Sequence, residues 1–197
     1  MQHEATPVTR TRSGPATRER ILQAAAELFY ADGIRATSAD RIITQVGITK
    51  VTFYRHFPTK SDLVVAYLIQ QAAGERGWFA TLRLPGDPAA SLRAIAEGIG
   101  AASCSPGFRG CAFINAAAEF SDPDDPVRVV VEEHRQWMLD DLASIAAEAG
   151  VPDAAAIARQ LMILRDGAMV NGYLGEASSV ADSLTAAFDS VITASGR

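Results

Sequence analysis

The segment between residues 37 and 60 concentrates side chains that can donate hydrogen bonds to a nucleic acid. A short stretch after Gly47 and Thr49 would expose most of them on a helix: Lys50, Val51, Thr52, Tyr54, Arg55 and His56. A short helix that presents phosphate and base-edge donors next to a glycine turn fits the major groove of DNA. The spacing therefore predicts a DNA-binding helix-turn-helix near the start of the chain.

This helix would have a buried and an exposed side at about 100° per residue. Phe53 and Phe57 fall together on the buried side, whereas Val51 and Arg55 point most directly away from it. Outward side chains can read base edges, and flanking side chains can bind phosphates, which positions a protein without reading sequence. The complete predicted DNA-binding set is Thr37, Thr49, Lys50, Val51, Thr52, Tyr54, Arg55, His56 and Lys60.

Capping residues and glycine or proline breaks divide the chain into the helices that must position this segment. Thr37 with Asp40, and Thr59 with Asp62, look like capping boxes that open two of these helices. No stretch alternates as a strand would, so the expected fold is all-α with about nine helices. The expected helices cover residues 17–32, 37–45, 49–57, 59–82, 88–102, 111–120, 126–149, 153–175 and 179–195.

Charge is distributed unevenly along the chain. The net charge of the 197 residues is −5, which by itself argues against a nucleic-acid partner. Residues 1–60, however, carry +4 and residues 61–197 carry −9. A positively charged N-terminal part and an acidic remainder are typical of a protein that contacts DNA with one end. We expect a flexible basic arm over residues 1–16, a helix-turn-helix domain over 17–62 and a second helical domain over 63–197.

Several classes of protein are disfavoured by what the sequence lacks. No apolar run approaches the roughly 18 residues that cross a bilayer, and the N-terminus does not resemble a signal peptide. We therefore expect a cytoplasmic protein with no membrane partner. The chain has no glycine-rich phosphate loop, nucleophile elbow or His-Glu metal motif, so we expect no enzymatic activity, no cofactor and no metal.

Cys104 and Cys111 flank a short loop, and two cysteines in a chain of this size are not a disulfide framework. We expect two buried free thiols, or one buried thiol and one in a loop. A redox regulator that uses both thiols, or a metal sensor that adds His134, is an alternative. Neither spacing resembles a closed metal site, and no basic cluster surrounds the cysteines in the sequence. A DNA-binding protein without effector control is a third alternative, and it predicts a C-terminal domain with no cavity.

Residues 18–68 resemble the DNA-binding domain of the TetR/AcrR family of transcriptional repressors. The resemblance is carried by Thr37-Ser38, Ile42, Val46-Gly47-Ile48-Thr49, Phe53-Tyr54-Arg55-His56-Phe57, Lys60 and Leu63. It implies that Thr37, Tyr54, His56 and Lys60 contact phosphates of a double-stranded operator. One departure is Val51, where many members carry glycine, and it bears on how closely this backbone approaches DNA.

The resemblance also implies a C-terminal domain that binds a small ligand and forms a homodimer through its last two long helices. Those helices carry apolar faces rich in small residues, which suit a four-helix interface but also suit the core of one chain. A dimer is expected independently because one short helix makes too few base contacts for specific binding. The predicted interface residues are Ile157, Leu161, Leu164, Leu184, Phe188, Val191 and Ile192.

The ligand pocket is expected where polar or soft side chains interrupt apolar helices. Asn115 stands out, because a buried amide needs partners from a ligand, from backbone carbonyls or from water. The candidates are Cys111, Asn115, Glu119, Phe120, His134, Trp137, Met138, Met162, Asp166, Met169 and Tyr173. We expect a repressor that a small, largely apolar effector releases from a palindromic operator by tilting the helix over residues 59–82.

Overall fold

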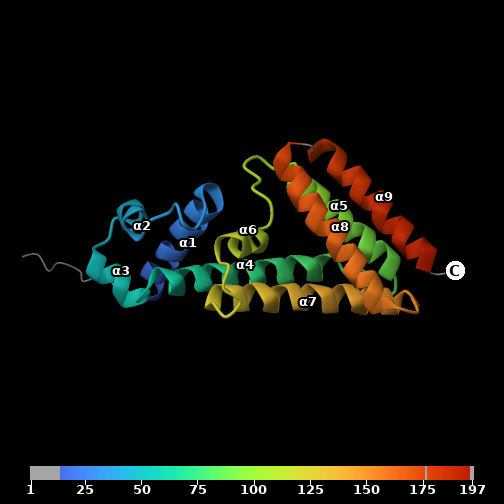
Figure 1. Cartoon of the computed structure of the whole chain (residues 1–197), viewed down its shortest axis with the longest axis horizontal. Coiled ribbons are helices and arrows are strands. Elements are labelled where there is room, and N and C mark those ends of the chain that lie inside the picture. The colour runs from blue at the N-terminus through green and yellow to red at the C-terminus, as the bar shows by residue number, and fades with distance from the viewer. Residues whose placement is uncertain (1–13, 176, 196–197) are drawn as a thin grey trace, which may run out of the picture.

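The computed structural model describes residues 14–175 and 177–195, and over these residues the chain folds into nine α-helices with no β-strand (Figure 1). The predicted all-α fold is confirmed. The helices are α1 (Pro15–Asp32), α2 (Ala39–Val46), α3 (Lys50–His56), α4 (Lys60–Leu82), α5 (Pro88–Ser103), α6 (Ala112–Glu119), α7 (Pro126–Glu148), α8 (Ala154–Leu174) and α9 (Ala177–Ser195). Most of the predicted basic arm, residues 1–13, lies outside the described residues, and its last residues belong to the start of α1.

The helix starts follow the capping residues closely. Thr59 and Asp62 form the expected capping box at the start of α4, and Thr49 caps α3 by accepting a hydrogen bond from the Thr52 amide. The capping box of Thr37 with Asp40 was a wrong prediction, because Ser38 caps α2 and accepts from the Arg41 amide at 3.2 Å. Thr37 points inward instead, and its hydroxyl donates to the Gly33 carbonyl at 2.9 Å.

The first three helices form a small unit around the start of α4. Gly47 ends α2 in the left-handed region at φ 70°, which turns the chain into α3 at no steric cost to glycine. Phe53 and Phe57 then anchor α3 against the core of this unit. As a result, the opposite face of α3 lies at one end of the molecule (Figure 1).

The body of the molecule is built on α4, which leaves the N-terminal unit and packs along α7 (Figure 1). Helices α5, α8 and α9 pack against one another at the far end. The contact between α5 and α9 is so close that a Cβ added at Gly100 would lie 2.5 Å from the Ala181 Cα. None of the described helices is both long and apolar enough to cross a membrane.

Candidate nucleic-acid interface and ligand pocket

Helix α3 presents the predicted DNA-binding side chains on one surface. Val51 is 79% exposed, and Lys50, Tyr54 and Arg55 are exposed as well. Thr52 and His56 are half-buried at the edges of this face. This arrangement follows from the burial of Phe53, which orients the other side of the helix towards solvent. The exposed face of α3 therefore carries hydrogen-bond donors for both base edges and phosphates, as a helix in the major groove requires.

Lys50 is held by the preceding helix. Its ammonium nitrogen lies 2.8 Å from the Asp40 Oδ1 atom, and this hydrogen-bonded pair raises the pKa of Lys50. Both side chains are largely exposed, so the pair contributes little to stability and a phosphate can replace the carboxylate. Lys50 therefore remains charged and available on the α3 surface.

Two of the residues assigned to phosphate contact lie deeper than the sequence suggests. Thr37 is fully buried, with its hydroxyl committed to backbone carbonyls, so this hydroxyl is not presented to a partner. The Lys60 ammonium donates to the Ile34 carbonyl at 2.6 Å, and burial lowers the pKa of Lys60, against the opposing effect of Glu119. A phosphate contact by Lys60 requires its ammonium to leave Ile34.

A cavity of about 640 Å³ lies at the centre of the molecule. Helix α4 contributes the longest wall, and α1, α5, α6 and α8 complete it. Exposed polar side chains such as Gln23 and Glu27 lie on its α1 side. Its apolar walls are largely aromatic: Tyr30, Tyr67, Trp78, Phe79, Phe108 and Phe113. The size and lining are those of a site for a small organic molecule.

A buried charged group forms part of the wall. Arg165 is only 4% exposed, and its guanidinium donates to Glu75 at 3.3 Å and to Asp166 at 3.1 Å. Burial lowers the pKa of Arg165, but the neighbouring Cys111, Glu75 and Asp166 outweigh this effect and raise it. The guanidinium therefore stays charged, and its pairing with Glu75 and Asp166 offsets the cost that an isolated buried charge would have.

His134 lies next to Glu75, the ion-pair partner of Arg165. Its Nε2 atom is 2.6 Å from the Glu75 Oε2 atom, and neither atom has a partner in hydrogen-bond geometry among the described residues. Phe113 stacks on the imidazole with ring centroids 3.7 Å apart and separates it from the cavity lining. His134 thus supports the wall and is not itself part of it.

Of the residues predicted to line a pocket, the structure brings together Cys111 and Met169. Met138 and Met162 are buried in the core, Trp137 packs on Phe79, and Asp166 pairs with Arg135 at 2.8 Å. None of these four residues belongs to the cavity lining.

The remaining predicted pocket residues also lie away from the cavity lining. Asn115 is exposed, not buried as its sequence context suggested, and its amide donates to the Arg109 carbonyl at 2.8 Å. Tyr173 is exposed too, and its hydroxyl accepts from Arg109 at 2.6 Å. Arg165 and Glu75 were not predicted from the sequence. The signal that could have identified them is a charged residue within an apolar helix.

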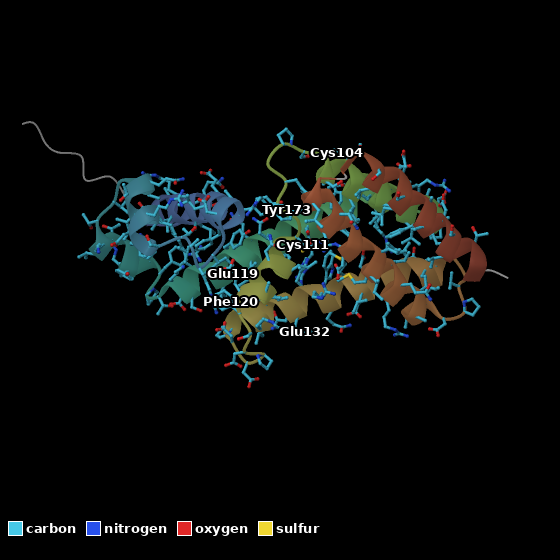
Figure 2. The ribbon with its side chains drawn as sticks, turned by 45° about the horizontal axis from the view of Figure 1, so that its top comes forward. Cys104, Cys111, Glu119, Phe120, Glu132 and Tyr173 are labelled. Atoms are coloured by element: carbon cyan, nitrogen blue, oxygen red, sulfur yellow. The ribbon has the colours of Figure 1, made fainter. Side chains whose placement is uncertain are left out.

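Glu119 and Phe120 link the end of α6 to the N-terminal unit. The Glu119 carboxylate accepts hydrogen bonds from the Ile34 amide at 2.9 Å and the Arg35 amide at 2.6 Å. The Arg35 guanidinium lies over the Phe120 ring. Figure 2 shows both residues at the end of α6 that faces α1–α3, whereas Cys111 lies at the other end. The same short helix therefore touches the cavity and the DNA-binding unit.

A second link joins α1 to the residues before α6. The Tyr30 hydroxyl accepts a hydrogen bond from the Arg109 amide at 2.9 Å and donates to the Gly110 carbonyl at 3.0 Å. Tyr30 also lines the cavity. A molecule in the cavity would thus contact both partners of this link.

The predicted dimer residues divide into two groups. Ile157, Leu161, Leu184 and Phe188 are buried within the single chain, and Leu164, Val191 and Ile192 are half-buried. The buried four pack between helices of one chain and offer no free surface. The exposed apolar side chains of α8 are different ones: Ile163, which is 72% exposed, Val170 and Leu174.

The two cysteines differ in solvent exposure. Cys104 is exposed near the end of α5 and Cys111 is buried, and neither forms a disulfide. Across the part of the chain that the structure describes, no three His, Cys, Asp or Glu side chains gather as a metal would require. A protein without effector control was expected to have no cavity in its C-terminal domain, whereas residues of α5, α6 and α8 help to line one here.

Comparison with known proteins places the chain in a family. Residues 21–67 match the model of bacterial regulatory proteins of the tetR family. Among curated proteins, the regulator AcrR of Shigella flexneri is 37% identical over 81 residues, and the nucleoid occlusion factor SlmA of Marinobacter nauticus is 44% identical over 59 residues. These matches span only 38% and 30% of those two proteins.

Solved structures match over nearly the whole chain. A TetR-family transcriptional regulator from Streptomyces coelicolor is 40% identical, with a TM-score of 0.88 over 91% of this chain and 96% of that one. A TetR-family regulator from Agrobacterium tumefaciens is 25% identical, with a TM-score of 0.76 over 88% of this chain and 96% of that one. Together with the helix-turn-helix geometry, these matches show that the chain belongs to the TetR family of transcriptional regulators.

Proposed function

We propose that this DNA-binding regulator is a homodimeric repressor that a small, largely apolar effector releases from a palindromic operator. The observation that carries the proposal is the cavity of about 640 Å³, whose walls include helices that directly hold the DNA-binding unit. The test is to select operator sequences from random duplex DNA, and then to measure their affinity with and without compounds that stabilise the protein thermally. Selected sequences without two-fold symmetry would contradict the dimeric arrangement.

The geometry supports a mechanism in which the effector acts through α4 and α6. The middle of α4, around Gln71, Glu75 and Trp78, lines the cavity, while its first turn packs into the DNA-binding unit. A ligand that pushes on α4 would tilt the helix and change the separation of the two α3 helices in a dimer. The ligand must bind the DNA-free arrangement more tightly, since equal affinity for both arrangements shifts nothing.

The dimer is proposed to form through the exposed faces of α8 and α9. Ile163, Val170 and Leu174 lie along one side of α8, and Gly167 between them has open space around its Cα. The exposed side of α9 carries small residues, including Ser183, Ala186 and Ser190. An apolar stripe beside a face of small side chains allows two copies to pack closely as a four-helix bundle.

Replacing Arg55 with alanine is expected to weaken operator binding by about 1–3 kcal/mol and to relax sequence preference, because an exposed arginine on α3 can read a guanine edge. Tyr54→Phe should instead weaken binding to all sequences alike, since a phenol can contact only phosphate from the flank of the helix. Fluorescence anisotropy on operator and mutated duplexes measures both effects. Arg93→Ala is the control, because Arg93 pairs with Asp189 far from α3. An unchanged preference in Arg55→Ala would remove this residue from the base-reading set.

Replacing Gly74 with leucine is expected to fill the cavity without a clash. Gly74 lines the cavity from α4, and a Cβ at this position meets no atom within 4 Å. The variant should lose affinity for an apolar dye such as Nile red by about 1–3 kcal/mol, the usual effect of overpacking an apolar space. Gly77→Leu is a matched control on the same helix, because Gly77 is equally open but is not part of the lining.

Both leucine variants should gain some helix stability, since glycine is a poor helix former. Thermal unfolding therefore checks that the difference in dye binding does not come from misfolding. Equal dye binding by the two variants would show that the cavity is not the binding site.

A further inference from the structure

The wall that α4 gives to the cavity carries four residues at helical spacing. Tyr67, Gln71, Gly74 and Trp78 follow one another along the helix, and all four belong to the lining. At about 100° per residue they lie within about 60° of one another around the helix axis. The rise of about 1.5 Å per residue separates Tyr67 from Trp78 by about 16 Å. One ligand can therefore contact two chemically different ends of this wall.

The first end presents a hydroxyl that the protein leaves without a partner. Tyr67 is only 2% exposed, and it lines the cavity. No described residue forms a hydrogen bond with its hydroxyl, and this oxygen is not among the unpartnered polar atoms that are sealed inside the protein. The hydroxyl is therefore open to the cavity. A buried donor of this kind gains from an acceptor placed beside it, because unpaired buried donors are costly.

The Tyr67 ring is held in place and keeps its proton. It packs edge to face on Phe29, with ring centroids 5.6 Å apart. Burial raises the pKa of Tyr67, and the neighbouring Tyr30 and Cys111 raise it further. The phenol is therefore a neutral donor at neutral pH. The Tyr30 hydroxyl differs, because the two backbone hydrogen bonds described above already occupy it.

Polarity changes along the α4 wall. The Gln71 amide, one turn after Tyr67, also has no hydrogen-bond partner among the described residues. The opposite end is aromatic, with Trp78 and Phe79 in edge-to-face contact at 5.4 Å. Trp78 is fixed against α5, since a Cβ added at Gly98 would lie 2.6 Å from its Cζ2 atom. The wall thus has a neutral polar end and an apolar end.

The charged side chains of the lining already have partners. The Arg165 guanidinium donates to the Glu75 and Asp166 carboxylates. The Glu27 carboxylate accepts from Gln23 at 3.0 Å and is exposed to solvent on the α1 side. In the described lining, a carboxylate ligand would meet no unpaired cation, and a cationic ligand would meet only a solvated carboxylate. Burying either charge is costly under these conditions.

We propose that the cavity binds an uncharged aromatic compound whose terminal carbonyl oxygen accepts a hydrogen bond from the Tyr67 hydroxyl. Its apolar body lies along Gly74 towards Trp78. This inference rests on the proposed function, because it names the chemical class of the effector for the same cavity. Tyr67 is then the residue that selects ligands with an oxygen acceptor.

The contact would also lie close to the DNA-binding unit. The Tyr67 ring packs on Phe29 of α1, and the Lys60 ammonium lies 6.0 Å from the centre of the Phe29 ring. A carbonyl on Tyr67 is thus two side-chain contacts from the start of α4. Ligands that use this hydroxyl are expected to act on both helices.

The test uses two compounds of the same shape, 2-acetylnaphthalene and 2-ethylnaphthalene, which differ by a carbonyl oxygen. Their dissociation constants are measured by equilibrium dialysis against the full chain and its Tyr67→Phe variant. The variant should bind the ketone about 3- to 10-fold more weakly, the usual effect of losing one hydrogen bond, and should bind the hydrocarbon equally well or better. An equal change for both compounds, or no change for the ketone, would overturn the proposal.

Two controls separate the hydroxyl from the fold. Tyr67→Phe should unfold at the same temperature as the unaltered chain or at a higher one, because the lost hydroxyl has no partner in the protein. A clearly lower unfolding temperature would indicate a structural role for the hydroxyl and contradict the proposal. Tyr173→Phe is the matched variant outside the lining, and it should bind both compounds like the unaltered chain.

Charged analogues test the neutral class with the unaltered chain. 2-Naphthoate and 2-naphthylmethylammonium keep the aromatic body and carry opposite charges. Both should bind at least about tenfold more weakly than 2-acetylnaphthalene, because the cavity would have to bury an unpaired charge. Tighter binding of the ammonium compound would assign the cavity to cations instead, and tighter binding of the acid would assign it to anions.

The proposed function and this inference fail differently. If Nile red binds in the cavity and the ketone does not, the ligand class is wrong and the cavity stands as a binding site. If operator affinity responds equally to the ketone and the hydrocarbon, effector control stands and the role of Tyr67 is wrong. If the ketone binds through Tyr67 and operator affinity does not change, the ligand class stands and the proposed release from the operator is wrong.

Discussion

Replacing Ile163 with glutamate is expected to convert the proposed dimer into a monomer. Ile163 is 72% exposed on α8 and is part of the proposed contact surface. A two-fold axis places the substitution twice in one interface, so a loss of about 2 kcal/mol per copy raises the dissociation constant of the dimer roughly a thousandfold. Size-exclusion chromatography with light scattering measures the change directly.

Operator affinity should fall together with the dimer, because one α3 helix reads too few bases for specific binding. Val129→Glu is the matched control, since Val129 is an exposed apolar residue on α7, outside the proposed interface. This variant should stay dimeric and bind the operator normally. A dimeric Ile163→Glu protein would show that the two copies meet through another surface.

Replacing Glu119 with alanine is expected to disconnect α6 from the DNA-binding unit. The change removes the acceptor of two amide hydrogen bonds, which at this partly exposed position contribute about 2–3 kcal/mol in total. Local opening should become easier by the same free energy, so hydrogen exchange at the Ile34 and Arg35 amides should accelerate by about 30- to 150-fold.

The same variant should reduce the effect of any effector on operator affinity, because it removes the contact of α6 with the DNA-binding unit. Glu132→Ala is the control: this carboxylate is exposed on α7, away from α1–α3 (Figure 2). It should leave both exchange and effector response unaltered. If Glu119→Ala changed neither, the coupling would have to pass through α4 or through the Tyr30 link.

The local features of the chain could be predicted well because they depend on a few neighbouring residues. The helical period assigned Phe53 to the interior and Val51 to the surface, and both assignments are confirmed. Caps and turns such as Thr49, Thr59 and Gly47 behave as expected. The exception is the cap of α2, for which Thr37 and Ser38 were both suitable. The Thr37 hydroxyl instead donates hydrogen bonds to the Leu28 and Gly33 carbonyls in the interior.

The cavity could not be predicted in the same way, because residues from five helices build it. Asn115 and Tyr173 seemed to be polar groups awaiting a ligand, yet Arg109 in the loop before α6 satisfies both. Arg165 was not among the predicted site residues, and only the fold brings this residue of α8 beside Glu75 of α4, to which it donates a hydrogen bond. No basic cluster lies near the cysteines in the sequence, but in the fold Arg165 and Cys111 belong to the same cavity wall.

The sequence by itself determined where the helices begin and end, which face of α3 meets solvent and which family the chain resembles, because these depend on short-range periodicity and on a contiguous motif. Only the tertiary structure decided which polar groups share a cavity and which apolar face of α8 is left uncovered. Helix α8 carries apolar residues on several sides, and its packing on α5, α7 and α9 leaves Leu161 buried and Ile163 exposed. Burial is a property of the packed arrangement, so periodicity within one helix does not reveal it.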